Sequence, residues 1–236
     1  MAAPPEIQPD WALFLDFDGT LVDIAARPER VTIPDGLPEL LRVAAGRLDG
    51  ALAVVSGRAL PVIDSFLVPY ADAAGAEHGA VVRKPDGSLD ETATPAVPAG
   101  WLTILEAAVA ANAGLVIERK PRSVVLHYRL APEKRAEARA LADALPGLDE
   151  YGFAVLAGHM AFEVKPRSVS KRRAVAVLME TPPFAGRRPV FVGDDVTDED
   201  GIAMACALGG FGLRVADDFG GSPANVRAWL RRGAGT

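Results

Sequence analysis

The sequence is poor in several kinds of residue, and each shortage excludes a kind of protein. It has one cysteine, Cys206, which excludes an internal disulfide and a cysteine-based zinc site. We expect this cysteine to be a small buried residue. No run of 18 apolar residues is present, so we expect no membrane span and no membrane partner.

Acidic side chains outnumber basic ones, 31 against 25. The formal net charge is −6 at pH 7 and the pI is about 5.2, which argues against nonspecific binding of nucleic acid. The sequence lacks the G-x-x-x-x-G-K motif with a following Ser or Thr, which disfavours a P-loop ATPase. The segment from Met1 to Asp10 is rich in proline and lacks the basic and apolar regions of a signal peptide, so we expect a cytoplasmic location.

The sequence does contain enough apolar material for a large core. Apolar residues make up 50% of the 236 positions, which allows one large domain or a core with a smaller insertion. Toward both ends of the chain, apolar runs alternate with segments of helical periodicity, which is typical of an α/β domain with a parallel sheet. The predicted strands there cover residues 11–16, 51–55, 72–79 with a turn, 189–193 and 213–215, and the predicted helices cover residues 37–48, 60–67, 171–179, 201–206 and 223–232.

The middle of the chain follows a different order. Proline and glycine punctuate residues 84–100, which indicates a linker or a loose hairpin. The next segments are predicted as helix, strand, strand, helix, strand, strand, which is typical of a small inserted α+β domain. We therefore predict a Rossmann-like α/β core with a parallel sheet, formed by residues 1–84 and 166–236, and an inserted domain with its linkers at residues 85–165.

The chain is organised around the segment Leu13–Leu21, in which an apolar strand ends in two carboxylates, Asp16 and Asp18. Residues two apart on a strand point the same way, so both carboxylates can aim at one spot as Gly19 bends the chain. Close like charges are costly, and a divalent cation is the usual remedy. Thr20 adds a hydroxyl and a backbone N–H beside the acids. A calcium loop shares the D-x-D-G pattern, but its further ligands and flanking helix are missing.

Other predicted strands also end in polar residues. The three strand ends with such residues are at Asp16 and Asp18, at Ser56-Gly57-Arg58, and at Asp194-Asp195. In open parallel sheets, ligands gather at the carboxyl ends of the strands. Acids from two strand ends can hold Mg²⁺, which prefers oxygen ligands and often serves phosphate substrates. The hydroxyl of Ser56 and the cation of Lys171 would complete a cradle for phosphate oxygens.

These elements together resemble the haloacid dehalogenase-like (HAD) superfamily. The match consists of D-x-D-G-T-L at residues 16–21, a strand ending in Ser56, a downstream Lys171, and G-D-D-x-T-D at residues 193–198. The resemblance implies that Asp16 is the nucleophile that forms an aspartyl-phosphate and that Asp18 is the general acid/base. The magnesium ligands that it implies are Asp16, the backbone carbonyl of Asp18, and Asp194, with Asp198 supporting the site. The phosphate-binding residues are then Gly19, Thr20, Ser56, Gly57 and Lys171.

Further motifs resemble the trehalose-6-phosphate phosphatase family. In that family S-G-R, E-H-G, E-x-K-x-x-S, H-Y-R and G-D-D-x-T-D-E-D recur in this order, and here they stand at residues 56–58, 77–79, 118–123, 127–129 and 193–200. The resemblance implies hydrolysis of trehalose 6-phosphate to trehalose and phosphate, with the inserted domain acting as a cap that sets the substrate. The implied substrate-binding residues are Arg58, His78, Gly79, Glu118, Lys120, His127, Arg129 and Glu163. One position departs from the pattern, because Arg172 stands after Lys171 where the family often has glycine.

Several of these residues also have a structural interpretation. Glu118 and Lys120 lie two apart on a predicted strand, where they could form a surface ion pair. His127 could be a structural histidine and Arg129 a solvated strand end. Glu163 stands between apolar residues and could face solvent by alternation.

Other functions of the same superfamily stay open at this point. They are a phosphatase of sucrose phosphate or mannosylglycerate phosphate, a non-catalytic sugar-phosphate sensor, and a phosphomutase. The complete set of Asp16, Asp18, Lys171 and Asp194 weighs against a non-catalytic protein. We expect a monomer that acts on a small sugar phosphate with Mg²⁺ as its cofactor.

Overall fold

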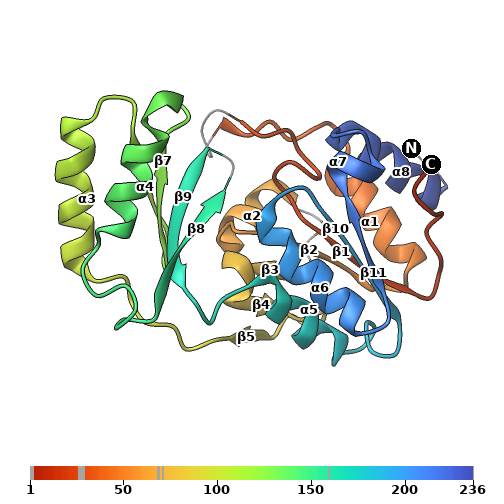
Figure 1. The fold of residues 1–236 in the computed structure, drawn as a ribbon. Helices are drawn as coiled ribbons and strands as arrows, with labels where there is room; N and C mark the ends of the chain where they lie inside the picture. The colour runs from red at the N-terminus through yellow and green to blue at the C-terminus, as the bar shows by residue number, and fades with distance from the viewer. Residues whose placement is uncertain (1–2, 26–29, 68–69, 71, 159, 236) are drawn as a thin grey trace. The chain divides into compact units, whose positions relative to one another are not determined.

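The computed structural model describes residues 3–25, 30–67, 70, 72–158 and 160–235. The chain divides into two compact units (Figure 1). The core unit comprises Met1–Thr92 and Ser170–Thr236, and the inserted unit comprises Ala93–Val169.

A largely parallel sheet forms the centre of the core unit. Within the described residues it has seven strands in the order β11-β10-β1-β2-β3-β4-β5. Neighbours from β11 to β3 run parallel, whereas β4 and β5 are antiparallel to their neighbours. The strands are β1 (Trp11–Leu15), β2 (Leu52–Val55), β3 (Ala73–Ala76), β4 (Val81–Arg83), β5 (Leu89–Glu91), β10 (Arg188–Gly193) and β11 (Phe211–Arg214).

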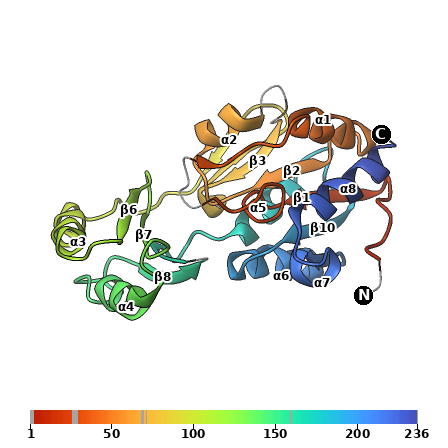
Figure 2. The ribbon, with the colours of Figure 1, turned by 90° about the horizontal axis from the view of Figure 1, so that it is seen from above.

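Helices cover the sheet on both faces. Helix α1 packs against α8, and α5 packs against α6, while Figure 2 shows α1 and α6 on opposite sides of the sheet. Both faces of β1 are therefore covered, and all five of its residues are buried. The helices of this unit are α1 (Leu37–Arg47), α2 (Leu60–Leu67), η2 (Glu77–Gly79), α5 (Lys171–Met179), η4 (Val196–Asp198), α6 (Glu199–Ala207), α7 (Val215–Asp218) and α8 (Pro223–Ala234).

Helix α1 illustrates how the sequence specifies these elements. It follows Gly36, and a proline stands in its first turn, where a missing N–H costs nothing. Leu37, Leu40, Leu41 and Ala44 are its buried residues at spacings of three and four. This spacing forms one apolar stripe, which is the face that packs toward the core.

The order of the strands reverses at β1, since β2 lies on one side of β1 and β10 on the other. In the register, Leu15 pairs with Val54 of β2 and with Val192 of β10. Asp16 after β1 and Asp194 after β10 therefore follow neighbouring strands at the carboxyl edge of the sheet, where ligands bind in such folds.

The inserted unit is an antiparallel sheet with two helices packed on it (Figure 1). Within the described residues the sheet has four strands in the order β6-β7-β9-β8. Helix α4 packs on β7 and β9, and α3 packs on β6 and α4. The elements are α3 (Ala99–Ala111), β6 (Val116–Arg119), β7 (Val124–His127), η3 (Pro132–Lys134), α4 (Arg135–Asp143), β8 (Phe153–Gly158) and β9 (Ala161–Pro166).

The two faces of this second sheet differ in character. Alternate residues such as Leu126, Phe153 and Phe162 belong to the apolar core of the unit, where the ring of Trp101 packs edge-on against Phe153 at 5.0 Å. The intervening residues point to the other face. That face carries Glu163, as well as the other charged residues of the H-Y-R and E-x-K motifs described below.

The first unit boundary, between Thr92 and Ala93, falls within the segment 84–100 that was predicted as a linker or loose hairpin. The predicted insertion begins at residue 85, yet β5 pairs with β4 in the core sheet. Its sequence, Leu89-Asp90-Glu91, is too short and too polar to indicate a strand. The second boundary falls between Val169 and Ser170 rather than after residue 165.

Two further expectations concern single features. Cys206 is exposed, not buried as predicted, because α6 buries Gly201, Ile202 and Ala205 and turns Cys206 away from them. Among the described residues, we find no helix whose length and apolar character would let it cross a bilayer.

Candidate active site

Acidic side chains from two neighbouring strand ends meet at the carboxyl edge of the core sheet. Asp16 follows β1, Asp194 follows β10, and Asp198 lies at the end of η4. One carboxylate oxygen from each of the three lies within 4.8 Å of the others. This geometry agrees with the prediction for Asp16 and Asp194, whereas the expectation that the Asp18 carboxylate points to the same spot is wrong, because both of its oxygens are paired with Arg58.

Lys171 joins this acidic cluster from the first residue of α5. Its ammonium forms an ion pair with Oδ1 of Asp16 and lies 2.5 Å from Oδ1 of Asp198. The lysine is buried, as are both of these aspartates. The other oxygen of Asp198 accepts hydrogen bonds from the backbone N–H groups of Asp194 and Asp195, each at 3.0 Å. Asp198 therefore fixes Lys171 and the loop that carries Asp194.

The turn after β1 brings Thr20 to the same cluster. The Thr20 hydroxyl donates to Oδ1 of Asp194 at 3.2 Å, which links the two strand ends. Gly19 has a φ of +87°, and a Cβ at this position would collide with the carboxylate of Asp194. Glycine is therefore required by both the backbone conformation and the close approach of Asp194.

Burial and mutual repulsion raise the pKa values of the acids. Burial, followed by the negative charge of Asp198, raises the pKa of Asp16 well above its ordinary value, although Lys171 acts in the opposite direction. Burial and the charge of Asp198 also raise the pKa of Asp194 to about 6. Burial alone would lower the pKa of Lys171, but Asp16 and Asp198 outweigh it and raise that pKa, so the amine stays charged.

This electrostatic balance fits a divalent cation. Lys171 neutralises one of the three carboxylates, so a partly buried excess of negative charge remains. The donors are all carboxylate oxygens, the ligands that Mg²⁺ prefers. Asp198 already uses its oxygens on Lys171 and on backbone N–H groups, so Asp16 and Asp194 are the residues with oxygens to offer an ion.

Asp18 lies outside this acidic cluster. Its two oxygens accept hydrogen bonds from Nε and Nη2 of Arg58, both at 2.7 Å. The guanidinium of Arg58 lies over the ring of Phe66 at 5.3 Å and that of Phe17 at 5.7 Å, and these two rings stack on each other. A bidentate pair of this kind fixes the orientation of the carboxylate.

Ser56, at the end of β2, is buried, and its hydroxyl oxygen accepts a hydrogen bond from the backbone N–H of Arg58 at 3.1 Å. The imidazole of His78 packs on Gly57, where a Cβ would collide with the ring. His78 and Gly79 belong to η2, which follows β3 in the core unit. The structure thus places His78 next to the Ser56-Gly57-Arg58 segment, whereas Gly79 lies against Ser170 and Ala174.

The polar face of the inserted unit carries most of the predicted substrate-binding residues. Nε2 of His127 lies 2.9 Å from Oε2 of Glu118, and since a carboxylate only accepts, Nε2 carries the proton. Burial raises the pKa of Glu118, but the hydrogen bond from His127 and the charge of Lys120 outweigh it and lower that pKa overall. Lys120 donates to Oε1 of Glu163 at 3.2 Å.

These contacts correct two structural interpretations made from the sequence. The ion pairs run between strands, from His127 to Glu118 and from Lys120 to Glu163, rather than from Glu118 to Lys120 within one strand. Glu163 is buried and does not simply face solvent. Its register position opposite Val125 of β7 places it in the middle of the polar face.

Sequence reasoning placed Ser123 in the E-x-K-x-x-S motif but assigned it no role in this group. Its hydroxyl donates to Oε1 of Glu163 at 2.6 Å, and Ser123 is itself buried. The alternation along β7 gives a usable signal, because Ser123, Val125 and His127 are two apart and share one face. Arg129 continues the same spacing beyond the strand.

Arg172, the departure from the family pattern, is exposed, while the neighbouring Lys171 is buried. The extra bulk of the arginine therefore points away from the lysine ammonium. The substitution leaves the contacts of Lys171 with Asp16 and Asp198 in place.

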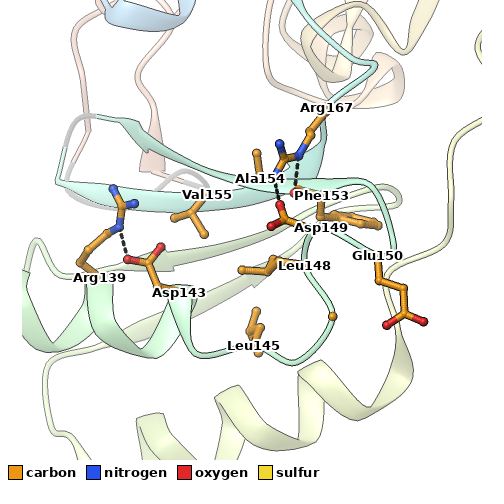
Figure 3. Close-up of a pocket in the computed structure, with 11 residues that line it drawn as sticks. Arg139, Asp143, Leu145, Leu148, Asp149, Glu150, Phe153, Ala154, Val155 and Arg167 are labelled. Atoms are coloured by element: carbon orange, nitrogen blue, oxygen red, sulfur yellow. Dashed lines mark hydrogen bonds and ion pairs between the residues drawn. The ribbon is translucent and has the colours of Figure 1, made fainter.

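A separate cavity of about 610 Å³ opens within the inserted unit, beside α4 and β8 (Figure 3). Arg139 pairs with Asp143 at 2.6 Å, and Arg167 pairs with Asp149 and with the carbonyl of Phe153. These pairs satisfy the arginines that line it. The lining residues include none of the acidic cluster and none of the polar-face residues, so we assign this cavity no part in the site.

The fold and this site define a class of protein. The chain has a parallel α/β core with an inserted α+β unit, and acids and a lysine meet at the strand ends of the core. This is the haloacid dehalogenase-like fold, and solved structures of that superfamily are similar to this chain. A solved structure of the Candida albicans trehalose-6-phosphate phosphatase C-terminal domain has a TM-score of 0.78 at 22% identity, covering 95% of this chain and 92% of that one.

The sequence comparisons define the family more narrowly. The trehalose-phosphatase family matches residues 14–206. A probable trehalose-phosphate phosphatase from Sinorhizobium fredii is 40% identical over 215 residues, which are 91% of this chain and 81% of that protein. The trehalose-6-phosphate phosphatase of Escherichia coli is 35% identical over 230 residues, 97% of this chain and 84% of that protein. The chain belongs to the trehalose-phosphatase family.

Proposed function

We propose that this protein hydrolyses trehalose 6-phosphate to trehalose and phosphate, with Mg²⁺ as its cofactor. The observation that carries the proposal is the meeting of Asp16, Lys171, Asp194 and Asp198 at the ends of β1 and β10. The substrate is supported by the names of the relatives from S. fredii and E. coli, which this chain resembles over most of its length.

In the first step, a carboxylate oxygen of Asp16 attacks the phosphorus atom. The bond between phosphorus and the sugar oxygen breaks, and Asp18 donates a proton to that leaving oxygen, so trehalose departs and an aspartyl-phosphate remains. In the second step, water attacks the same phosphorus while Asp18 accepts its proton. The bond to Asp16 breaks, phosphate leaves, and the free carboxylate is restored.

Charged groups around Asp16 make this attack possible. Lys171 places a buried ammonium against Asp16, where it offsets the repulsion between the carboxylate and the incoming phosphate. Asp198 holds that ammonium in place, and the Ser56 hydroxyl is a further donor for phosphate oxygens. When bound, Mg²⁺ held by Asp16 and Asp194 supplies additional positive charge for the same purpose.

Arg58 controls the orientation of Asp18 in this scheme. Both Asp18 oxygens accept hydrogen bonds from Arg58 in the structure, so one oxygen must be released and must take up a proton from water before it can donate that proton to the sugar oxygen. The stacking of Arg58 on Phe66 keeps the guanidinium in place while the carboxylate turns.

We assign sugar recognition to the polar face of the inserted unit. Glu118, Lys120 and Glu163 offer charged hydrogen-bonding groups suited to sugar hydroxyls, and His127 and Ser123 orient the two glutamates. A site built to hydrogen-bond hydroxyl groups rejects a substrate that lacks them, because its polar groups are then left unpaired. The second glucose ring would therefore be recognised here.

A phosphate-release assay tests this proposal. Trehalose 6-phosphate, sucrose 6-phosphate and glucose 6-phosphate are compared with and without magnesium, and EDTA serves as the metal-removal control. We expect trehalose 6-phosphate to be preferred over glucose 6-phosphate by at least about 100-fold in kcat/KM, and activity to disappear with EDTA. Equal rates for the two substrates would exclude a disaccharide-reading unit, and a preference for sucrose 6-phosphate would reassign the substrate.

A further inference from the structure

The turn η2 has an unusual backbone. Its three residues, Glu77, His78 and Gly79, have φ angles of +49°, +56° and +92°. Left-handed backbone is uncommon for residues other than glycine, and two consecutive examples persist only when their surroundings impose them. The contacts on the two sides of this turn identify what imposes it.

On one side, η2 is bonded to the segment that carries Ser56. The backbone N–H of His78 donates to the carbonyl of Ser56, and that of Glu77 donates to the carbonyl of Arg58, both at 2.9 Å. The His78 ring lies against Gly57, the residue between them, at a distance that leaves no room for a Cβ. The position of the Ser56 segment is therefore set by the position of this turn.

On the other side, η2 packs against the first turn of α5. A Cβ on Gly79 would collide with the backbone carbonyl of Ser170 and crowd the backbone N of Ala174. Ser170 directly precedes Lys171 and Ala174 lies one helical turn after Ser170, and the ammonium of Lys171 belongs to the acidic cluster. The turn thus stands between the strand end that presents the Ser56 hydroxyl and the helix start that presents Lys171.

Arg173 connects η2 with α5 and β5. Its Nη1 donates to the carbonyl of Gly79 at 2.7 Å, and its Nη2 forms an ion pair with Asp90 in β5. The Arg173 side chain is 20% exposed, and Asp90 lies within 3.7 Å of the ammonium of Lys84 as well. One planar guanidinium therefore connects α5, the carbonyl of the strained turn and the edge strand of the sheet.

We propose that Arg173 is a positioning residue for the phosphoryl-binding groups. By holding η2 against α5, it fixes the spacing between the Ser56 hydroxyl and the Lys171 ammonium. This inference rests on the proposed function only in taking those two groups as phosphate ligands, and it does not depend on which sugar is bound. Arg173 touches no reacting atom.

The experiment compares Arg173→Ala and Arg173→Lys with Arg172→Ala. Arg172 is the matched control, since it lies on the same helical turn but is exposed. Three quantities are measured: kcat and KM with trehalose 6-phosphate, the same constants with 4-nitrophenyl phosphate, and the affinity for inorganic phosphate by calorimetry. Thermal unfolding establishes that each variant is folded.

A misplacement of about 1 Å can cost about 100-fold in rate, so we expect Arg173→Ala to lower kcat by about 10- to 100-fold for both substrates. The affinity of Arg173→Ala for inorganic phosphate should also fall, whereas its KM for trehalose 6-phosphate should change less than its kcat. Arg173→Lys keeps the charge without the planar fork and should lie in between. Arg172→Ala should stay within about twofold of the unchanged protein.

Asp90→Ala provides a second test that leaves α5 and the turn untouched. It removes the outer partner of Arg173, and we expect a smaller loss in the same direction for both substrates. If Arg173→Ala does not fold, Asp90→Ala and Arg173→Lys decide the question. Folded variants that bind phosphate and turn over 4-nitrophenyl phosphate as the unchanged protein does would overturn the proposal. If trehalose 6-phosphate is not a substrate, the proposed function fails, but the phosphate and 4-nitrophenyl phosphate measurements still judge Arg173.

Discussion

The two units of this protein hold their charged residues in different ways. In the core unit, the side chains of Lys171 and Asp198 are 3% and 1% exposed, and backbone N–H groups fix Asp198 in turn. In the inserted unit, the side chains of Glu118 and Lys120 are 31% and 15% exposed, and both are held by other side chains. The buried Lys171–Asp198 pair is therefore fixed by backbone groups, while Glu118 and Lys120 are held by side chains, as Asp18 of the core unit is held by Arg58.

This difference indicates a division of labour, in which the core unit carries out the reaction and the inserted unit recognises the substrate. A buried cluster fixed by backbone hydrogen bonds suits a reaction whose geometry is the same for every phosphate ester. A polar face of partly exposed, mutually paired side chains suits recognition, since hydroxyl groups of a sugar can join or replace those pairs. Variants in the two units should therefore affect chemistry and substrate choice separately, and the following predictions test that separation.

The largest effect is expected from Asp16→Asn in the core unit. An amide is not a nucleophile toward phosphorus, so kcat should fall by at least about 10⁴-fold for trehalose 6-phosphate and 4-nitrophenyl phosphate alike. Phosphate release over long incubations measures the loss, and Asp200→Asn, an exposed acid of α6, is the matched control. Residual activity above one hundredth of normal would exclude Asp16 as the nucleophile.

Glu118→Ala in the inserted unit should change substrate choice. Losing a charged hydrogen bond to a sugar hydroxyl costs about 1.5–3 kcal/mol, so kcat/KM for trehalose 6-phosphate should fall by about 10- to 100-fold. The value for 4-nitrophenyl phosphate should change by less than about threefold. Glu106→Ala, which removes an exposed acid of α3, is the control. Equal losses for both substrates would mean that the polar face acts on chemistry instead.

Arg58→Lys tests a core residue that acts through another side chain. Lysine cannot form the bidentate pair with Asp18, so the carboxylate should be less well oriented, and kcat should fall by about tenfold for both substrates. The pH dependence of kcat is compared between Arg58→Lys and the unchanged protein, and a difference shows that Asp18 exchanges its proton less effectively in the variant. A loss restricted to trehalose 6-phosphate would assign Arg58 to sugar binding.

The smallest predicted effect is on stability. Because the folded-state pKa of Asp194 is raised from 3.8 to about 6, its stabilising contribution is complete below the unfolded pKa and is lost as pH rises through about 6. In EDTA at neutral pH, Asp194→Asn should therefore melt about 2–4 °C higher than the unchanged protein, after allowance for solvent screening. At about pH 4 the two proteins should melt together.

Magnesium provides the internal check on this prediction. Added magnesium should raise the melting temperature of the unchanged protein at neutral pH and should act much less on Asp194→Asn. A lower melting temperature for Asp194→Asn in EDTA at neutral pH would show that the carboxylate stabilises the metal-free fold, contrary to the electrostatic argument.

In the core unit, the sequence predicted the arrangement of the strand ends better than it predicted the pairing of side chains. Asp16, Lys171 and Asp194 were predictable as neighbours, because apolar runs define buried parallel strands whose ends meet at one edge. The pairing of Asp18 with Arg58 was not, since it depends on how two side chains 40 positions apart rotate toward each other. Strand β5 escaped prediction because three residues carry too little periodicity.

In the inserted unit, the elements were predictable and their partners were not. The hairpin of β6 and β7 and the two helices follow from apolar periodicity and turn residues. The pairing of His127 with Glu118, and of Lys120 with Glu163, depends on the register between strands, which the sequence alone leaves open. That register also explains why no role could be assigned to Ser123, which donates to Glu163.

The most direct test of this division of labour is to locate the phosphoryl group on the enzyme. The unchanged protein and Glu118→Ala are each mixed with trehalose 6-phosphate or 4-nitrophenyl phosphate, quenched in acid within one turnover, and digested for mass spectrometry. We predict a phosphoryl group on Asp16 from both substrates in the unchanged protein, and from 4-nitrophenyl phosphate but much less from trehalose 6-phosphate in Glu118→Ala. A phosphoryl group on another residue, or equal loss of labelling from both substrates in Glu118→Ala, would contradict the account.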